Sequence, residues 1–143
     1  MKARLALTCF AAVLSFALAM PALAIEPGSK EEQRLALLNA NAGEPVTRVK
    51  FLRPIHAYEM VGPLNVLIWE TPTRAWLLDL RESDSCRYLD REFKISIDTL
   101  SDSINSTNGY IRSVGGQICR IDRMRKVDVK AWKAAEREAG IRE

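Results

Sequence analysis

Histidine and cysteine are scarce in this sequence, which leaves little material for a metal site or a thiol nucleophile. There is one histidine, His56, and there are three cysteines, none of which stands in a C-x-x-C pair. A zinc site needs three or four ligands held close together, and no such cluster surrounds His56 in the sequence. No spacing of residues forms a catalytic signature, so we expect a non-catalytic protein that needs no cofactor.

Long hydrophobic runs are absent beyond residue 24, and so are internal repeats and low-complexity tracts. Of the 143 residues, 48% are hydrophobic and 27% are charged, which is the balance of a foldable globular chain. The length suffices for one domain. These features exclude a multidomain enzyme and a polytopic membrane protein.

The first segment, residues 1–24, has the pattern of a cleaved secretory signal peptide. The pattern consists of a positive start at Lys2 and Arg4, a largely apolar run from Leu5 to Leu18, and the small-x-small sequence Ala22-Leu23-Ala24. We predict cleavage between Ala24 and Ile25. The alternative is a retained membrane anchor, but the run is shorter than the ~20 residues that cross a bilayer. No transmembrane segment is therefore expected after cleavage.

Cleavage changes both the charge and the cysteine count. It removes two of the 21 basic residues and none of the 18 acidic ones, so the mature chain 25–143 carries a net charge of +1. A nearly neutral domain gives no general electrostatic case for nucleic-acid binding. Cleavage also removes Cys9 and leaves Cys86 and Cys119, which in an oxidising compartment most often form one disulfide. A metal pair or a catalytic thiol is the alternative. We expect a periplasmic or secreted protein.

Periodicity and turn residues predict a helix, then about six strands, then a second helix. Ser29 and Glu32 have the spacing of a capping box ahead of a short helix at 30–40. Strands are predicted at 46–51, 64–69, 74–80, 93–98, 110–114 and 117–121, and residues 99–108 are predicted to be a loop. Thr71-Pro72-Thr73 and Gly115-Gly116 mark hairpin turns. The second helix is predicted at 127–140, with Asp128 as its cap.

Six short antiparallel strands favour a small curled or barrel-like sheet. The expected fold class is therefore α+β, with a small curled or barrel-like antiparallel sheet, a helix at each end and one disulfide. The expected organisation is a signal peptide at 1–24, an N-terminal segment with a short helix at 25–45, and a single α+β domain at 46–143.

Several runs of the chain resemble a known family. They are Phe51-Leu52-Arg53, the hairpin from Val66 to Leu80 that leads to Cys86, Cys119-Arg120-Ile121-Asp122, and Val127-Asp128-Val129-Lys130-Ala131. Together they resemble a family of small exported proteobacterial proteins classed as domain of unknown function number six-four-nine-one. Members usually have Tyr at the position of Trp76 and often Pro at that of Lys126. The resemblance implies an exported, disulfide-bearing α+β domain and implies no activity.

One stretch of the mature chain concentrates positive charge. It contains Arg120, Arg123, Arg125, Lys126, Lys130 and Lys133, against only Asp122 and Asp128. Such a stretch could form a binding surface for phosphate, an anionic lipid, lipopolysaccharide or a protein partner. Alternatively, it is the solvated polar face of a strand and a helix, neutralised by nearby acids. We take the first five of these basic residues as the candidate binding site.

Three other groups of residues are candidates for a functional site. His56 could be the general base of a small envelope hydrolase, although no nucleophile or carboxylate is spaced to pair with it. The acidic residues Glu82, Asp84, Asp90 and Glu92 lack the Gly and the alternation of a calcium loop. The aromatic residues Phe51, Trp69, Trp76 and Tyr110 could line a groove, but core packing accounts for them more simply. The main hypothesis is a non-catalytic exported binding module, and the alternative is a hydrolase centred on His56.

Overall fold

The computed structural model describes residues 28–86, 88–92, 94–99 and 102–142. The predicted signal peptide, its cleavage site and Cys9 lie outside this part of the chain. Within the described residues, no helix is both long enough and apolar enough to cross a membrane.

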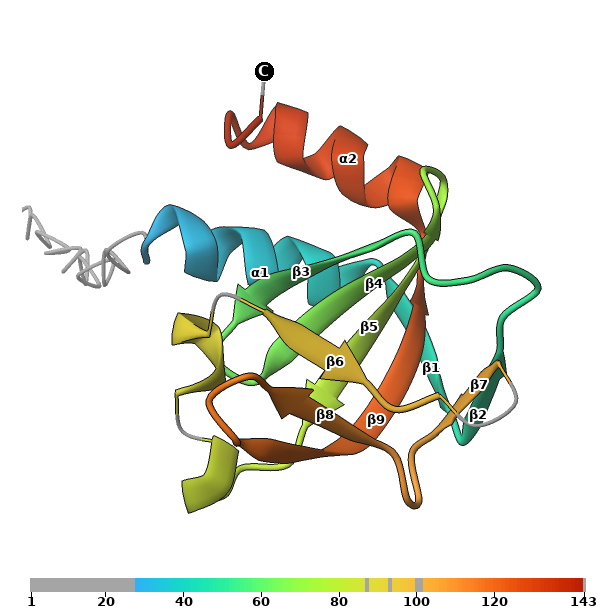
Figure 1. The fold of residues 1–143 in the computed structure, drawn as a ribbon. Coiled ribbons are helices and arrows are strands. Elements are labelled where there is room, and N and C mark those ends of the chain that lie inside the picture. Colours follow the sequence, from blue (N-terminus) through green and yellow to red (C-terminus); the bar gives the residue numbers. More distant parts are fainter. Residues whose placement is uncertain (1–27, 87, 93, 100–101, 143) are drawn as a thin grey trace, which may run out of the picture.

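Along the described chain, an α-helix precedes the β-strands and a second α-helix follows them, which is the order predicted (Figure 1). The helices are α1 (Lys30–Ala40) and α2 (Val129–Glu138). The strands are β1 (Ala42–Val46), β2 (Arg48–Lys50), β3 (Ala57–Gly62), β4 (Asn65–Thr71), β5 (Arg74–Leu80), β6 (Ile95–Ile97), β7 (Ser103–Asn105), β8 (Tyr110–Ser113) and β9 (Ile118–Val127). Two short 3₁₀ turns, η1 (Asp84–Cys86) and η2 (Leu89–Arg91), follow β5.

Six of the strands form one antiparallel sheet that curls into half of a barrel (Figure 1). Their order is β3-β4-β5-β9-β8-β6, while β1 pairs with the end of β9 and β2 pairs with β7. At the open side of the half-barrel, the N–H of Ile95 on β6 donates a hydrogen bond to Tyr58 Oη on β3 at 3.0 Å. The predicted small curled antiparallel sheet with a helix at each end is confirmed.

Both faces of the curled sheet are buried. On the inner face, Val66, Ile68 and Leu78 pack with residues from β8, β9 and the loops. On the outer face, Leu67 and Leu77 pack beneath α1 and α2. A strand covered on both faces has no solvent side, so its sequence is apolar throughout instead of alternating. This explains why β4 and β5 appear in the sequence as continuous apolar runs.

Helix α1 begins at the predicted capping box and is held to α2 by a buried ion pair. Ser29 Oγ accepts the N–H of Glu32 at 3.2 Å, and the Glu32 carboxylate accepts the N–H of Ser29 at 3.0 Å. Further along α1, the Arg34 guanidinium donates to Glu59 on β3 at 2.6 Å and to the buried Glu136 on α2 at 2.9 Å. The hydrogen bond to Glu59, together with that to Glu136, raises the pKa of Arg34 above its ordinary value although partial burial opposes the change. Arg34 therefore fastens both helices to the edge of the sheet.

Cys86 and Cys119 form the predicted disulfide. Both side chains are fully buried in the inner core. The bond joins η1 to β9 across 33 positions of sequence, so it ties the segment that follows the β4–β5 hairpin to the opposite half of the sheet.

Several element boundaries differ from the predictions. The predicted loop at 99–108 contains β7, and no element was predicted where β3 lies. β6 covers only part of the predicted strand at 93–98, whose residue 93 lies outside the described chain. β9 continues to Val127 although the predicted strand ended at 121. β9 is longer than predicted because its polar end pairs with β1 on one side and β5 on the other. These long-range pairings outweigh the weak strand pattern of its own sequence.

Candidate functional site

A bulge in β9 decides where the basic side chains point. Asp79 of β5 pairs with Arg123, but the next residue, Leu80, pairs with Ile121, so Asp122 has no cross-strand partner. One extra residue in a strand exchanges the two faces for every residue beyond it. Beyond the bulge the residues of β9 alternate in the ordinary way, so Arg123 and Arg125 lie on the outer face of the sheet and Lys126 lies on the inner side.

Arg123 and Arg125 are both held by one buried carboxylate, that of Asp79. Arg125 Nη2 lies 2.9 Å from Asp79 Oδ2 and Arg123 Nε lies 3.3 Å from the same oxygen. Asn65 donates to the other oxygen at 2.8 Å, and Arg125 also donates to Asn39 on α1 at 2.6 Å. These two arginines connect β5, β9 and α1, and the one carboxylate of Asp79 offsets part of their combined charge within the fold.

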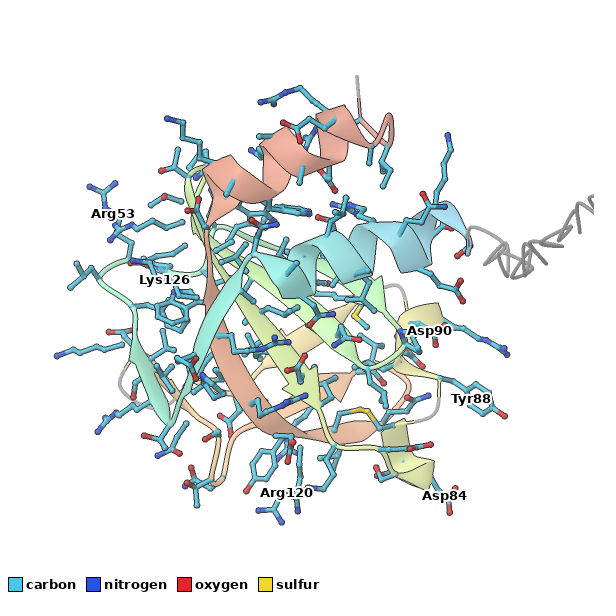
Figure 2. The ribbon with its side chains drawn as sticks, turned by 180° about the vertical axis from the view of Figure 1, so that it is seen from behind. Arg53, Asp84, Tyr88, Asp90, Arg120 and Lys126 are labelled. Carbon is cyan, nitrogen blue, oxygen red and sulfur yellow. A yellow bond between two sulfur atoms is a disulfide. The ribbon has the colours of Figure 1, made fainter. Side chains whose placement is uncertain are left out.

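Arg120 lies apart from the other predicted binding residues. It sits near the start of β9, ahead of the bulge, and its guanidinium donates to the carbonyl oxygen of Thr107 at 3.0 Å. Figure 2 shows Arg120 and Lys126 well apart, Arg120 at the bottom of the view and Lys126 at its left side. The five predicted residues therefore do not form one surface.

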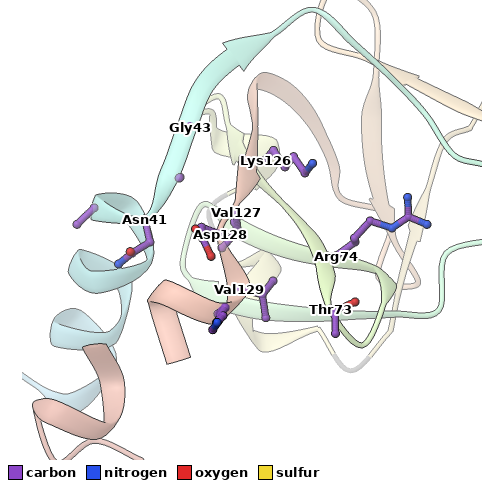
Figure 3. Close-up of a pocket in the computed structure, with 11 residues that line it drawn as sticks. Asn41, Gly43, Thr73, Arg74, Lys126, Val127, Asp128 and Val129 are labelled. Atoms are coloured by element: carbon purple, nitrogen blue, oxygen red, sulfur yellow. The ribbon is translucent and has the colours of Figure 1, made fainter. Parts of the chain in front are cut away.

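Lys126 and Lys130 line a single cavity together with Arg74, which the sequence did not indicate. The cavity has a volume of about 680 Å³ and lies where the end of α1, β1, the β4–β5 turn and the start of α2 meet (Figure 3). Both lysines are exposed, and neither has an acidic partner among the described residues. Arg74 and Lys126 project in the same direction from the neighbouring strands β5 and β9 (Figure 3).

Two carboxylates moderate the positive charge of this cavity. Glu70, whose side chain is 6% exposed, lies 3.7 Å from Arg74, a loose ion pair. Asp128 lines the cavity and uses Oδ1 to accept the N–H of Ala131 at 3.0 Å, which caps α2 as predicted. Three cations against these two carboxylates leave a net positive charge, and both carboxylates already have partners in the fold.

Arg74 belongs to this site because of strand pairing alone. It stands 52 positions before Lys126 in the sequence, and the antiparallel pairing of β5 with β9 brings the two strands side by side. The only local signal was the turn at Thr71-Pro72-Thr73, which places Arg74 at the start of a strand. That turn gives no information about which strand becomes its neighbour.

The sequence pattern of a family described as "Family of unknown function (DUF6491)" matches residues 3–143. The chain belongs to the DUF6491 family. The family resemblance found in the sequence is thereby confirmed. No curated protein and no solved structure matches the chain. The family description states no activity, so the function of this DUF6491 protein has to be argued from its own residues.

The single histidine of this DUF6491 protein lies outside any catalytic arrangement in the described chain. The side chain of His56 is exposed and has no hydrogen-bond or ion-pair partner among the described residues. Only its backbone N–H is engaged, donating to the carbonyl oxygen of Trp69 at 2.8 Å. The hydrolase alternative requires a carboxylate or hydroxyl held against His56, and no described residue supplies one.

The acidic residues Glu82, Asp84, Asp90 and Glu92 are spread over the segment between β5 and β6. The carboxylate of Glu92 accepts the N–H of Gly115 at 3.2 Å, and Figure 2 shows Asp84 and Asp90 at separate points of this segment. Across the ranges that the structure covers, no three His, Cys, Asp or Glu side chains are grouped to hold a metal ion.

The aromatic residues do not share one groove. Phe51 is buried in the inner core, and Trp76 packs against the same cluster. Trp69 lies on the outer face, with its ring centroid 6.2 Å from that of Trp132 and the Lys133 ammonium 5.2 Å from its own centroid. Tyr110 is stacked by Arg112 on β8. Lys133, the remaining member of the basic stretch, is thus engaged with an aromatic ring.

Proposed function

We propose that this DUF6491 protein is an exported, non-catalytic binding module that holds an anionic ligand with Lys126, Lys130 and Arg74. Export follows from the signal-peptide pattern of residues 1–24. The buried disulfide agrees with it, because such bonds persist mainly in oxidising compartments. The ligand is an anionic component of the cell envelope or of a partner protein.

One observation carries the binding proposal. Cations from three different elements line one cavity of about 680 Å³, and two of them lack an acidic partner within the described chain. Surface lysines normally face water singly, whereas cations gathered around a concave site raise the local concentration of an anion. The arginines that could have joined them are held by Asp79 instead.

The binding proposal is tested with the mature chain 25–143 and three small anions that share one aromatic body: phenyl phosphate, phenyl sulfate and benzoate. Binding is followed by amide chemical shifts in NMR. We expect at least one of the three to bind, with shifts at Thr73, Lys126 and Lys130. In the double variant Lys126→Gln/Lys130→Gln, the affinity should fall about tenfold or more, since two charge-assisted contacts are lost.

The matched control is Lys30→Gln/Lys94→Gln. It removes the same charge from two exposed lysines outside the cavity, so it should leave the affinity unchanged. Binding of none of the three anions, or equal losses in the two double variants, would overturn the proposal.

Export is tested by producing the full-length chain in a Gram-negative host and fractionating the cells. The expected product lies in the periplasm, begins at Ile25, and has the mass of a chain with one disulfide. It should also resist maleimide labelling until a reductant is added. A full-length cytoplasmic product with free thiols would contradict the proposal of export.

A further inference from the structure

The chemistry of the Arg74–Lys126–Lys130 cavity indicates which anion it takes, an inference that rests on the proposed anion-binding function. We infer that the ligand is a phosphomonoester group carried on a larger organic molecule. Three features of the cavity support this: the number and kind of its cations, its size, and the shape of the wall around Gly43.

The three cations come from different elements and differ in geometry. Arg74 at the start of β5 offers a planar guanidinium, while Lys126 on β9 and Lys130 on α2 offer compact ammonium groups. A terminal phosphate has three oxygens, one for each of the three cations, whereas a carboxylate has only two. It also carries a charge of about −1.5 to −2 at pH 7, against −1 for a carboxylate or a sulfate ester.

The ion pair between Arg74 and Glu70 is a long one. Glu70, the acidic partner of Arg74 among the described residues, lies 3.7 Å away, which is longer than the closest acidic contact of Arg34, Arg123 or Arg125. Close charge-assisted hydrogen bonds between nitrogen and oxygen are about 2.7–2.9 Å long. A phosphate oxygen can therefore form a shorter contact with Arg74 than Glu70 does, while Glu70 stays behind the guanidinium.

The size of the cavity points to a ligand larger than phosphate alone. Its volume of about 680 Å³ lies within the ~300–1,000 Å³ of small-molecule sites. One wall consists of Ala40, Ala42 and Gly43. Their side chains are small or absent, which leaves room for the organic part of a ligand. A Cβ added at Gly43 would meet only the Lys126 carbonyl oxygen, at the ordinary contact distance of 3.6 Å. The backbone at Gly43 therefore has room for a Cβ atom.

The test compares affinities for the three anions that share the phenyl body. Phenyl phosphate should bind the mature chain about tenfold more tightly than phenyl sulfate or benzoate, and more tightly than inorganic phosphate. The variant Gly43→Val should weaken phenyl phosphate binding and leave the affinity for inorganic phosphate unchanged. An unchanged affinity of Gly43→Val for phenyl phosphate, or equal losses for phenyl phosphate and inorganic phosphate, would overturn the assignment of this wall to the organic body.

The pH dependence supplies a second readout. The second ionisation of a phosphomonoester lies near pH 6, so affinity for phenyl phosphate should fall as the pH drops through about 6. Phenyl sulfate stays singly charged over this range. Any change in the charge of the cavity affects both ligands. The groups concerned are Arg74, Lys126, Lys130, Asp128 and the nearby Glu70. The ratio of the two affinities therefore reports the ionisation of the phosphate group of the ligand.

The outcomes separate this inference from the proposed function. If all three phenyl anions bind equally and all lose affinity in Lys126→Gln/Lys130→Gln, the anion-binding function stands and the phosphomonoester inference is overturned. Equal affinity for phenyl phosphate and inorganic phosphate would overturn the inference that the ligand has an organic part that contacts the cavity. Sedimentation with vesicles containing phosphatidic acid, compared with phosphatidylglycerol, then distinguishes a lipid headgroup from a soluble phosphomonoester. Binding to phosphatidic acid alone identifies the lipid source, and binding to neither vesicle identifies a soluble one.

Discussion

At the scale of single residues, Asp79 has the largest influence on the arrangement of charge. Its side chain is 9% exposed and forms ion pairs with both Arg123 and Arg125, while it also accepts a hydrogen bond from Asn65. A buried arginine that loses its carboxylate partner keeps its charge, because its pKa is too high for neutralisation. The stability of this part of the fold therefore depends on one carboxylate.

We predict that Asp79→Asn lowers the free energy of unfolding by about 3 kcal/mol, the low end for breaking a buried ion pair, because Arg123 remains partly hydrated. Urea denaturation of the mature chain measures the change. The control is Asp122→Asn, which removes an exposed carboxylate close to Arg81 and Arg123 and should cost less than about 1 kcal/mol. Similar losses in the two variants would show that Asp79 has no special role.

At the scale of elements, the start of α2 serves both the fold and the cavity. Asp128 caps the helix through the N–H of Ala131 and is also the one carboxylate in the lining of the cavity. The two roles can be separated, since Asn caps a helix about as well as Asp but carries no charge.

We predict that Asp128→Asn leaves the free energy of unfolding nearly unchanged and tightens the binding of phenyl phosphate several-fold, because a negative charge leaves the cavity. Asp128→Ala should tighten binding in the same way but lower the free energy of unfolding by about 1 kcal/mol. Titration and urea denaturation of both variants provide the comparison. Weaker anion binding in both would mean that Asp128 does not act on the ligand electrostatically.

At the scale of the whole molecule, the Cys86–Cys119 disulfide joins the two halves of the half-barrel. The sheet is open between β3 and β6, so it lacks the closing strand pair that would fix a complete barrel. A covalent link across 33 positions limits the conformations of the unfolded chain and thereby stabilises the folded one.

We predict that the double variant Cys86→Ala/Cys119→Ala loses roughly 3–4 kcal/mol of unfolding free energy, the chain-entropy estimate for a loop of this length. The measurement is urea denaturation with and without a reductant. Reductant should destabilise the wild-type protein to the level of the variant and leave the variant unchanged. A variant as stable as the oxidised protein would show that the bond contributes nothing to stability.

Local chemistry made part of the fold predictable. The capping box at Ser29 and Glu32, the β4–β5 hairpin and the Gly115-Gly116 turn are determined by residues close in sequence, and each was predicted. β3 and β7 were missed because neither has a clear alternating pattern, and both are stabilised by their partners β4 and β2. Strand propensity depends more on such neighbours than on the segment itself.

The candidate site was predictable only in part. Lys126 and Lys130 stood out as members of a basic stretch, but so did Arg123 and Arg125, which Asp79 holds. Successive strand residues face opposite sides, which separates Arg125 from Lys126, and the bulge at Asp122 determines which side of the sheet each of them takes. Sequence alone offered no sign of this bulge.

By itself, the sequence determined the helix at each end of the antiparallel strands, the β4–β5 and β8–β9 hairpins, the disulfide and the family, because these follow from composition, cysteine count and short-range patterns. Only the tertiary structure decided which cations remain unpaired and which residues they meet. Arg74 joins Lys126 because β5 pairs with β9, and Arg125 leaves the group because Asp79 faces it. Long-range strand pairing sets the register, and the register determines which charges share a cavity.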